Sequence, residues 1–171
     1  MVNDVYLGFG ANKENKIGNI LKAVELINSD PECEVIKFSS LYETKPYGGI
    51  EQKNYINAAA EISTRYSLLE LLNFVKAAEK KIGRTPSTRW GAREIDIDIL
   101  LYYDFVYSDD VITVPHKEMI YRDFVLVPLI EICPDLVHPV LNKKLSDINN
   151  GLSEKYILNK FNKEEVTNYG F

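Results

Sequence analysis

The spacing of apolar residues divides the first half of the chain into strands and one helix. Residues 5–10 predict a first strand that ends in a glycine turn. Asp30-Pro31 ends the helix that follows. Its apolar stripe, at helical spacing, consists of Ile17, Ile20, Leu21, Val24 and Ile27. Residues 35–42 and 55–62 predict two more strands, separated by a loop at 44–54 without periodicity.

A capping box begins the second predicted helix, because Glu70 follows Ser67 by three residues. Gly83 ends this helix, and its buried stripe consists of Leu68, Leu71, Leu72, Val75 and Ile82. The later elements predicted are a loop at 84–91, strands at 93–99 and 111–114, and a helix at 124–132 that ends at Pro134. The polar tail, 154–171, is interpreted as a frayed helix.

This order of elements, βαββαβ and then more, predicts an α+β fold with helices on a mainly antiparallel sheet. The 171 residues fit one domain, expected to span 1–171. A net charge of −5 argues against general nucleic-acid binding, which needs a basic surface. The longest apolar run, 99–103, is far too short to cross a membrane. Cys33 and Cys133 form no CxxC pair, and no signal peptide is visible, so we expect a cytoplasmic protein with free thiols.

The strongest chemical signal is the pair Asp96 and Asp98 in an alternating strand. Side chains two apart in a strand share one face, so these carboxylates lie within about 7 Å of each other. They repel unless a cation lies between them, and oxygen ligands suit Mg²⁺. Spacing alone favours the alternative, the solvent face of an edge strand with the isoleucines turned inward.

A basic loop directly before this strand raises the weight of the functional interpretation. It contains Arg84, Arg89, Trp90 and Arg93. Guanidinium groups bind phosphate oxygens in pairs, and a tryptophan face can stack on adenine or support an arginine. Such a loop beside two carboxylates predicts a site in which the arginines and a metal ion together neutralise the charge of phosphate groups. The absence of GxxxxGK[ST] excludes a P-loop enzyme.

Other candidates are individually weaker. His116 and Arg122 could donate hydrogen bonds to a polyphosphate, although a lone histidine is more often structural. Tyr55, Asn57 and Phe124 could stack on and read a flat heterocycle, although both aromatic residues could equally belong to the core.

Assembled in order, these residues resemble the 6-hydroxymethyl-7,8-dihydropterin pyrophosphokinase family. Residues 89–100, RWGAREIDIDIL, are similar to its signature. Supporting stretches are LGFGAN at 7–12, SSLYET at 39–44, YINA at 55–58, VPH at 114–116 and RDFVLVPL at 122–129. The resemblance covers about 5–148 and leaves the tail at about 154–171 unmatched.

The resemblance implies a ferredoxin-like α-β-α sandwich that transfers pyrophosphate from ATP to the pterin, with two Mg²⁺ ions held by Asp96 and Asp98. It assigns catalysis to Arg84, Arg93, Asp96 and Asp98. It assigns ATP binding to Leu72, Glu79, Arg84, Trp90, Arg93, Ile99, Thr113, His116 and Arg122. It assigns pterin binding to Thr44, Lys45, Pro46, Tyr47, Tyr55, Asn57 and Phe124. A monomer without nucleic-acid or membrane partners is expected.

Several positions depart from the family pattern, namely Pro86, Ala92, Lys117 and Val111. They affect the second loop and the phosphate contacts, and leave the metal pair untouched. The competing hypothesis is a non-catalytic ferredoxin-like domain that binds a ligand or RNA through exposed aromatic residues. The negative net charge and the Asp96/Asp98 pair both disfavour RNA, because carboxylates repel its phosphates.

Overall fold

The computed structural model describes residues 3–49, 51–86 and 91–161. Its main sheet is antiparallel, with the strand order β10-β3-β4-β1-β5, and β2 also pairs with β4. The strands of this sheet are β1 (Asn3–Ala11), β2 (Cys33–Phe38), β3 (Leu41–Thr44), β4 (Tyr55–Thr64), β5 (Asp96–Tyr102) and β10 (Ile157–Phe161). The order of β3, β4, β1 and β5 is that of a ferredoxin-like βαββαβ unit, so the predicted α+β class is confirmed.

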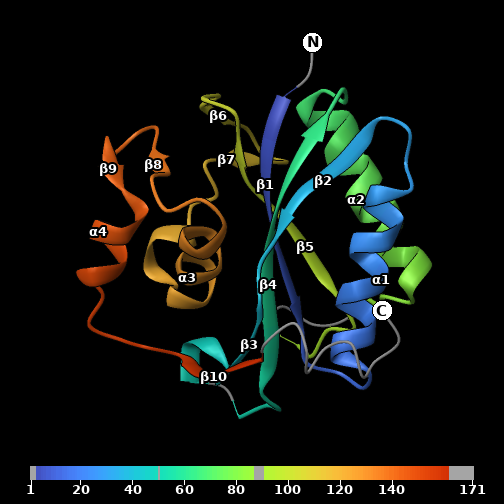
Figure 1. Ribbon diagram of the computed structural model, residues 1–171. Coiled ribbons are helices and arrows are strands. Elements are labelled where there is room, and N and C mark those ends of the chain that lie inside the picture. The colour runs from blue at the N-terminus through green and yellow to red at the C-terminus, as the bar shows by residue number, and fades with distance from the viewer. Residues whose placement is uncertain (1–2, 50, 87–90, 162–171) are drawn as a thin grey trace.

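Helices cover both faces of the sheet (Figure 1). One layer holds α1 (Lys16–Asn28) and α2 (Leu68–Ile82), and the other holds α3 (Asp123–Ile132) and α4 (Leu145–Asn150). Small elements lie between the larger ones along the chain: 3₁₀ turns at Tyr47–Gly49 and Met119–Tyr121, and hairpins of β6 (Tyr107–Ser108) with β7 (Thr113–Val114) and β8 (Val137–His138) with β9 (Lys143–Lys144). None of the described helices is long and apolar enough to cross a membrane.

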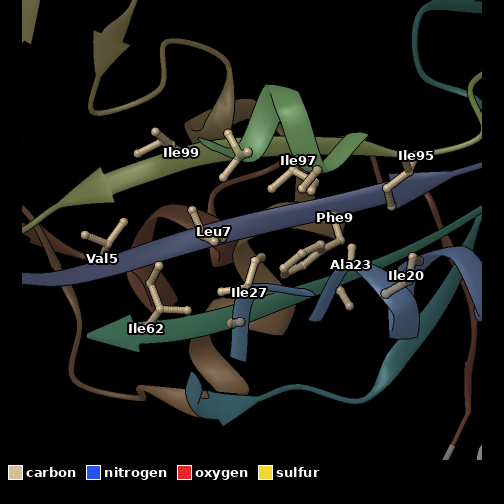
Figure 2. Close-up of a cluster of buried hydrophobic side chains, with 14 of the residues drawn as sticks. Val5, Leu7, Phe9, Ile20, Ala23, Ile27, Ile62, Ile95, Ile97 and Ile99 are labelled. Atoms are coloured by element: carbon tan, nitrogen blue, oxygen red, sulfur yellow. The ribbon is translucent and has the colours of Figure 1, made fainter. Parts of the chain in front are cut away.

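The larger core lies between the sheet and the α1/α2 layer (Figure 2). Ile97 and Ile99 of β5 point into it and are almost fully buried. Burying such a side chain contributes roughly 1.5–3 kcal/mol, and a slip of one residue would exchange the two faces of the strand. The isoleucines therefore fix the register that turns Asp96 and Asp98 to the opposite face.

Two helix boundaries follow from local chemistry, as the sequence predicts. The Ser67 hydroxyl accepts a hydrogen bond from the Glu70 amide, and the Glu70 carboxylate accepts one from the Ser67 amide, which completes the capping box. Gly83 ends α2 with a φ of 111°, a conformation that favours glycine. Helix α3 begins at Asp123, one residue before the predicted start.

The strand predicted over 35–42 is wrong as one element, because it breaks at Ser39 and Ser40. The Ser39 hydroxyl accepts a hydrogen bond from the Ala59 amide at 2.9 Å and donates one to the Ser40 carbonyl at 2.7 Å. The amide and hydroxyl of Ser40 both donate to Glu131 of α3. At the break these side-chain bonds accompany the one remaining backbone bond to β4 that is described there, from the Ser39 amide to the Ala59 carbonyl at 2.9 Å.

Other boundaries also differ from the prediction. The first strand does not end in a glycine turn, since β1 continues through Gly8 and Gly10 to Ala11. The strand predicted over 93–99 begins at Asp96, because the Arg93 amide donates to the Asn12 side chain. The strand predicted over 111–114 is reduced to β7, because Asp109 accepts the amides of Val111 and Ile112 in a turn. These changes leave the order of the core elements intact.

The polar tail is not a frayed helix where the structure describes it. Ile157–Phe161 form β10, which pairs with β3 as an edge strand of the sheet. The elements α4, β6, β8 and β9 were not expected from the sequence. A register defined by non-local pairing carries little local signal, which accounts for the missed strand.

Candidate active site

A cavity of about 340 Å³ opens on the α3 face of the sheet. Residues of β1, β4 and β5 form its floor, and residues after β3 and at the start of α3 form its walls. It therefore lies opposite the large core, on the face to which Asp96 and Asp98 point.

Two glycines of β1 keep the cavity floor open. In the sheet register, Gly10 lies between Asn57 and Asp96, and Gly8 lies beside Asp98. A Cβ atom on Gly10 would stand 3.1 Å from the Asn57 Oδ1 atom, which is tighter than an ordinary contact. A side chain at this position would occupy the space above the carboxylates, and glycine leaves it free.

Asp96 and Asp98 are half-buried and line the cavity. Although β5 is an edge strand, this face is not a fully solvated one, which disfavours the alternative of a plain solvent face. Arg84 pairs with Asp96, at 2.7 Å between Nη2 and Oδ1, and Arg93 Nε lies 3.9 Å from Asp96 Oδ2. The predicted neighbourhood of carboxylates and arginines is therefore present in the fold.

Burial and the charge of Asp98 raise the pKa of Asp96 to about 6. Arg84 and Arg93 act in the opposite direction, and the two arginines do not outweigh burial together with the second carboxylate. The negative charge of the two carboxylates is thus incompletely neutralised by the arginines in the metal-free protein. A divalent cation would relieve this repulsion, and oxygen donors on one face fit Mg²⁺ completed by water or phosphate.

The raised pKa of Asp96 predicts that the stability of the metal-free protein depends on pH. The folded-state pKa of about 6 exceeds the ordinary value of 3.8, so the folded protein holds this proton more tightly than the unfolded chain. The resulting stabilisation is complete below about pH 4 and is lost as the pH rises through about 6.

We expect the free energy of unfolding to fall by about 1 kcal/mol more in the wild type than in Asp96→Asn between about pH 4 and about pH 7. The figure is reduced from the full linkage value because solvent screens a partly exposed group. Urea unfolding of both proteins at both pH values measures this difference, and subtraction removes the other carboxyl groups. The same pH dependence in both proteins would contradict the raised pKa.

Glu79 connects helix α2 to the arginine that pairs with Asp96. Its side chain is almost fully buried and accepts hydrogen bonds from Arg84, from Lys76 Nζ at 2.8 Å and from the Ile97 amide at 2.7 Å. A buried carboxylate needs such partners. Glu79 therefore holds both the Arg84 side chain and the beginning of β5 in place.

Gln52 lines the cavity and Asn12 supports it, and sequence reasoning assigned neither residue a role. The Asn12 side chain is buried, accepts from the Arg93 amide at 2.7 Å and donates to Gln52 Oε1 at 3.1 Å. Asn12 thus links the loop before β4 to the start of β5. Its presence in the family-like stretch LGFGAN was the signal that could have identified it.

Aromatic and amide side chains form the other wall of the cavity. The rings of Tyr47 and Phe124 meet edge to face, with centroids 6.0 Å apart, and the Arg122 guanidinium lies 4.8 Å from the Tyr47 ring centroid. Asn57 Nδ2 donates to the buried Thr44 hydroxyl at 2.8 Å. Burial raises the pKa of the Tyr55 phenol, so this hydroxyl stays protonated.

His116 lies at the end of β7, next to Pro115. Its amide donates to the Leu100 carbonyl at 2.9 Å, and its Nδ1 accepts from the Glu118 amide at 3.2 Å. Burial lowers the pKa of His116, so the ring is neutral near pH 7. With Nδ1 accepting, the proton of the neutral ring belongs on Nε2, where it can be donated to a ligand.

The cavity brings together ten of the residues singled out from the sequence: Thr44, Lys45, Tyr47, Tyr55, Asn57, Arg93, Asp96, Asp98, Arg122 and Phe124. It does not include Pro46, Leu72, Glu79, Arg84, Ile99, Thr113 and His116. Arg89 and Trp90 lie outside the described residues. The part of the chain that is described contains no cluster of three or more His, Cys, Asp or Glu able to hold a metal, so protein ligands alone do not complete a metal shell there.

Residues 6–134 match the model of the family described as 7,8-dihydro-6-hydroxymethylpterin-pyrophosphokinase. The chain belongs to this family. A relative named 2-amino-4-hydroxy-6-hydroxymethyldihydropteridine pyrophosphokinase, from Aquifex aeolicus, is 43% identical over 84% of this chain and 88% of its own length. The Haemophilus influenzae protein of the same name is 38% identical over 78% of this chain and 84% of its own. The pyrophosphokinase family predicted from the residues is thus confirmed.

Longer relatives contain a similar segment. The Schizosaccharomyces pombe folic acid synthesis protein fol1 is 38% identical over 83% of this chain, which spans only 19% of that protein. A solved structure, Plasmodium falciparum HPPK-DHPS with pteroate, has a TM-score of 0.71 at 16% identity and covers 88% of this chain and 42% of its own. At that identity the likeness supports the fold alone. The family match makes the chain a pterin pyrophosphokinase-type enzyme of folate biosynthesis.

Proposed function

We propose that the chain transfers the β,γ-pyrophosphate of ATP to the hydroxymethyl group of 6-hydroxymethyl-7,8-dihydropterin, giving AMP and the pterin diphosphate. One observation carries the proposal: a single cavity joins the Asp96/Asp98 pair to a wall containing Tyr55, Asn57 and Phe124. The first group suits metal and polyphosphate, and the second suits a flat polar heterocycle.

We assign the metal role to Asp96 and Asp98, with Mg²⁺ bound together with ATP, two ions in all. The metal would neutralise polyphosphate charge and acidify the attacking hydroxyl. In the metal-free protein Arg84 and Arg93 pair with Asp96. With a cation bound at that carboxylate, the guanidinium atoms that now face Asp96 could bind phosphate oxygens instead, while Glu79 would still hold Arg84 in place.

We assign pterin binding to the aromatic wall of the cavity. Tyr55 and Phe124 stack on the ring, Asn57 reads its edge, and the 44–47 backbone contributes further contacts. The Thr44 hydroxyl already fixes the Asn57 amide, since Asn57 Nδ2 donates to it at 2.8 Å. A preoriented amide loses less freedom when it binds a ligand.

The proposed ATP subsite extends beyond the cavity, along β5 toward α2 and β7. Leu72 and Ile99 pack in the same apolar cluster, and Thr113 lies on β7. We assign these residues to the adenosine part of ATP. The neutral His116 would bind its polar groups, Glu79 would lie by the nucleotide and act through Arg84, which it holds, and Arg122 would bind phosphate. Arg122 is suited to this because its Nε is buried without a hydrogen-bond partner among the described residues.

In the transfer, a bond forms between the hydroxymethyl oxygen and the β-phosphorus. The bond from that phosphorus to the oxygen bridging it to the α-phosphorus breaks, and its electron pair leaves with AMP. The hydroxyl proton is released, and we assign no side chain as its base. Arg84, Arg93 and Arg122 stabilise charge on the transferring group, while the cavity walls align the reactants.

Mixing the protein with ATP, Mg²⁺ and the pterin tests this function directly. We expect AMP and the pterin diphosphate in equal amounts, and no product when Mg²⁺ is chelated. Formation of ADP with a pterin monophosphate would contradict pyrophosphate transfer. Absence of any pterin product would contradict the proposed function as a whole.

Phe124→Ala and Tyr55→Ala are each expected to weaken pterin binding by about 1–3 kcal/mol, the range seen for stacking of a base on an aromatic ring. ATP affinity should change little, because neither ring is assigned to the nucleotide. Calorimetry with each ligand measures both effects. Phe105→Ala is the matched control, since Phe105 is 48% exposed, stacks on Tyr107 and meets the Tyr102 ring edge to face, away from the cavity lining. Impaired ATP binding with unchanged pterin binding would reverse the two subsites.

A further inference from the structure

The segment around Tyr156 lies beyond the family match at 6–134, yet it contacts both walls of the cavity. Strand β10 lies beside β3 and the 3₁₀ turn at Tyr47–Gly49 (Figure 1), with Ile157 paired to Thr44. The Lys45 amide donates to the Tyr156 carbonyl at 3.0 Å. The chain is therefore bonded to the 44–47 wall where β10 begins.

Tyr156 and Ile157 are also bonded to the start of α3, which forms another part of the cavity wall. Asp123 directly precedes Phe124, and one of its carboxylate oxygens accepts the amides of Tyr156 at 2.9 Å and Ile157 at 3.2 Å. Asp123 is 2% exposed, and its second oxygen has no partner among the described residues. Burying a carboxylate is costly, so these two charge-assisted bonds are the principal compensation there.

The Tyr156 ring stands behind the aromatic wall. Its centroid lies 5.2 Å from that of Tyr47 and 5.9 Å from that of Phe124, and Lys45 Nζ lies 5.1 Å from it. Tyr156 does not line the cavity, whereas Tyr47 and Phe124 do. It contacts the two rings that would face a ligand without facing the ligand itself.

We propose that Tyr156, anchored by Asp123, is a positioning residue for the pterin subsite: it sets the orientation of Phe124 and Tyr47. This inference rests on the proposed function, in which Phe124 stacks on the pterin. Each aromatic pair contributes about 0.5–1.5 kcal/mol, so losing the Tyr156 ring frees two side chains that must be ordered again on binding. Of the described residues assigned to ATP, Arg122 lies over both rings, 4.8 Å from the Tyr47 centroid and 5.8 Å from that of Phe124. The others lie along β5, α2 and β7, so ATP affinity should depend on the Tyr156 contacts far less than pterin affinity does.

The test measures binding of the pterin and of ATP, each by calorimetry, to the wild type and to variants of the full chain. Tyr156→Ala is expected to raise the Kd for the pterin about tenfold and to leave that for ATP within about twofold. Tyr156→Phe should stay within about twofold for both ligands, because it keeps the ring. Leu158→Ala is the matched control on the same strand, since Leu158 is 57% exposed. Should Tyr156→Ala fail to fold, Tyr156→Leu replaces it, since leucine keeps apolar bulk without an aromatic ring.

A double-mutant cycle separates positioning from general damage. Asp123→Ala alone should weaken pterin binding, and should weaken it less when Tyr156 is already alanine, because both changes release the same rings. In turnover, Tyr156→Ala should raise KM for the pterin by a larger factor than it lowers kcat, since most of the lost ring contact is made equally in the bound state and in the transition state. Equal loss of ATP and pterin affinity, or unchanged pterin affinity in folded Tyr156→Ala, would overturn the inference. Failure of the wild type to bind the pterin would instead overturn the proposed function, and the inference with it.

Discussion

Asp98→Ala is expected to lower turnover by about three decades or more and to leave the fold intact. Asp98 lines the cavity beside Gly8 and Asp96, where the metal and the polyphosphate are proposed to meet. Removing a ligand of metals that neutralise a transferring group costs several kcal/mol of barrier, and about 1.4 kcal/mol corresponds to each decade. The neighbouring isoleucines still bury on the other face, so the register of β5 is retained.

Steady-state kinetics over a range of Mg²⁺ concentrations measures this effect, with thermal unfolding as the check on the fold. The metal-free variant should be at least as stable as the wild type, because the negative charge of Asp98 helps to raise the pKa of Asp96. Asp104→Ala is the control, an exposed carboxylate two residues beyond the end of β5. Activity near the wild-type value, with its Mg²⁺ dependence unchanged, in both Asp96→Ala and Asp98→Ala would exclude the metal assignment.

The acidic pair could be predicted from sequence because strand alternation is a local property. The pattern of isoleucine and aspartate over 95–99 assigns each residue to a face without reference to any other strand. The capping box at Ser67 and the end of α2 at Gly83 are local in the same way. Long, strongly periodic elements were therefore predicted correctly, and their order gives the ferredoxin-like sheet.

The parts of the site that were missed depend on pairing between distant segments. Asn12 accepts an amide from Arg93, 81 residues away, and Asp123 accepts one from Tyr156, 33 residues away. Neither the residue types nor their spacing in the sequence predict such a hydrogen bond. The role of Gly8 and Gly10 likewise becomes visible only when β1 lies between β4 and β5, since glycine within a strand reads locally as a turn or an interruption.

The loop before β5 carries the second large effect, and its geometry separates two of its residues. Arg93 is a half-buried cavity residue, and its Nε lies 3.9 Å from Asp96 Oδ2. Pro86 is exposed. The neighbouring Thr85 is already anchored, since its hydroxyl lies 2.9 Å from Glu94 Oε1 and its amide donates to the same carboxylate. Burial opposes ionisation of Glu94, but hydrogen bonds from Lys13 and Thr85 lower its pKa to about 2.

Arg93→Ala is therefore expected to lower turnover by about two decades, the cost of removing one donor from a developing negative charge. Its backbone bonds to Asn12 survive the substitution, so the effect should not come from unfolding.

Pro86→Arg is expected to change turnover by less than about tenfold. It adds a charge worth up to about 1 kcal/mol at an exposed site and removes a restraint worth about 0.4–1 kcal/mol, so the two effects oppose each other. Kinetics on both variants decide the matter, with Arg65→Ala as the exposed arginine control. A larger change in Pro86→Arg than in Arg93→Ala would show that loop stiffness, and not charge beside the carboxylates, limits the reaction.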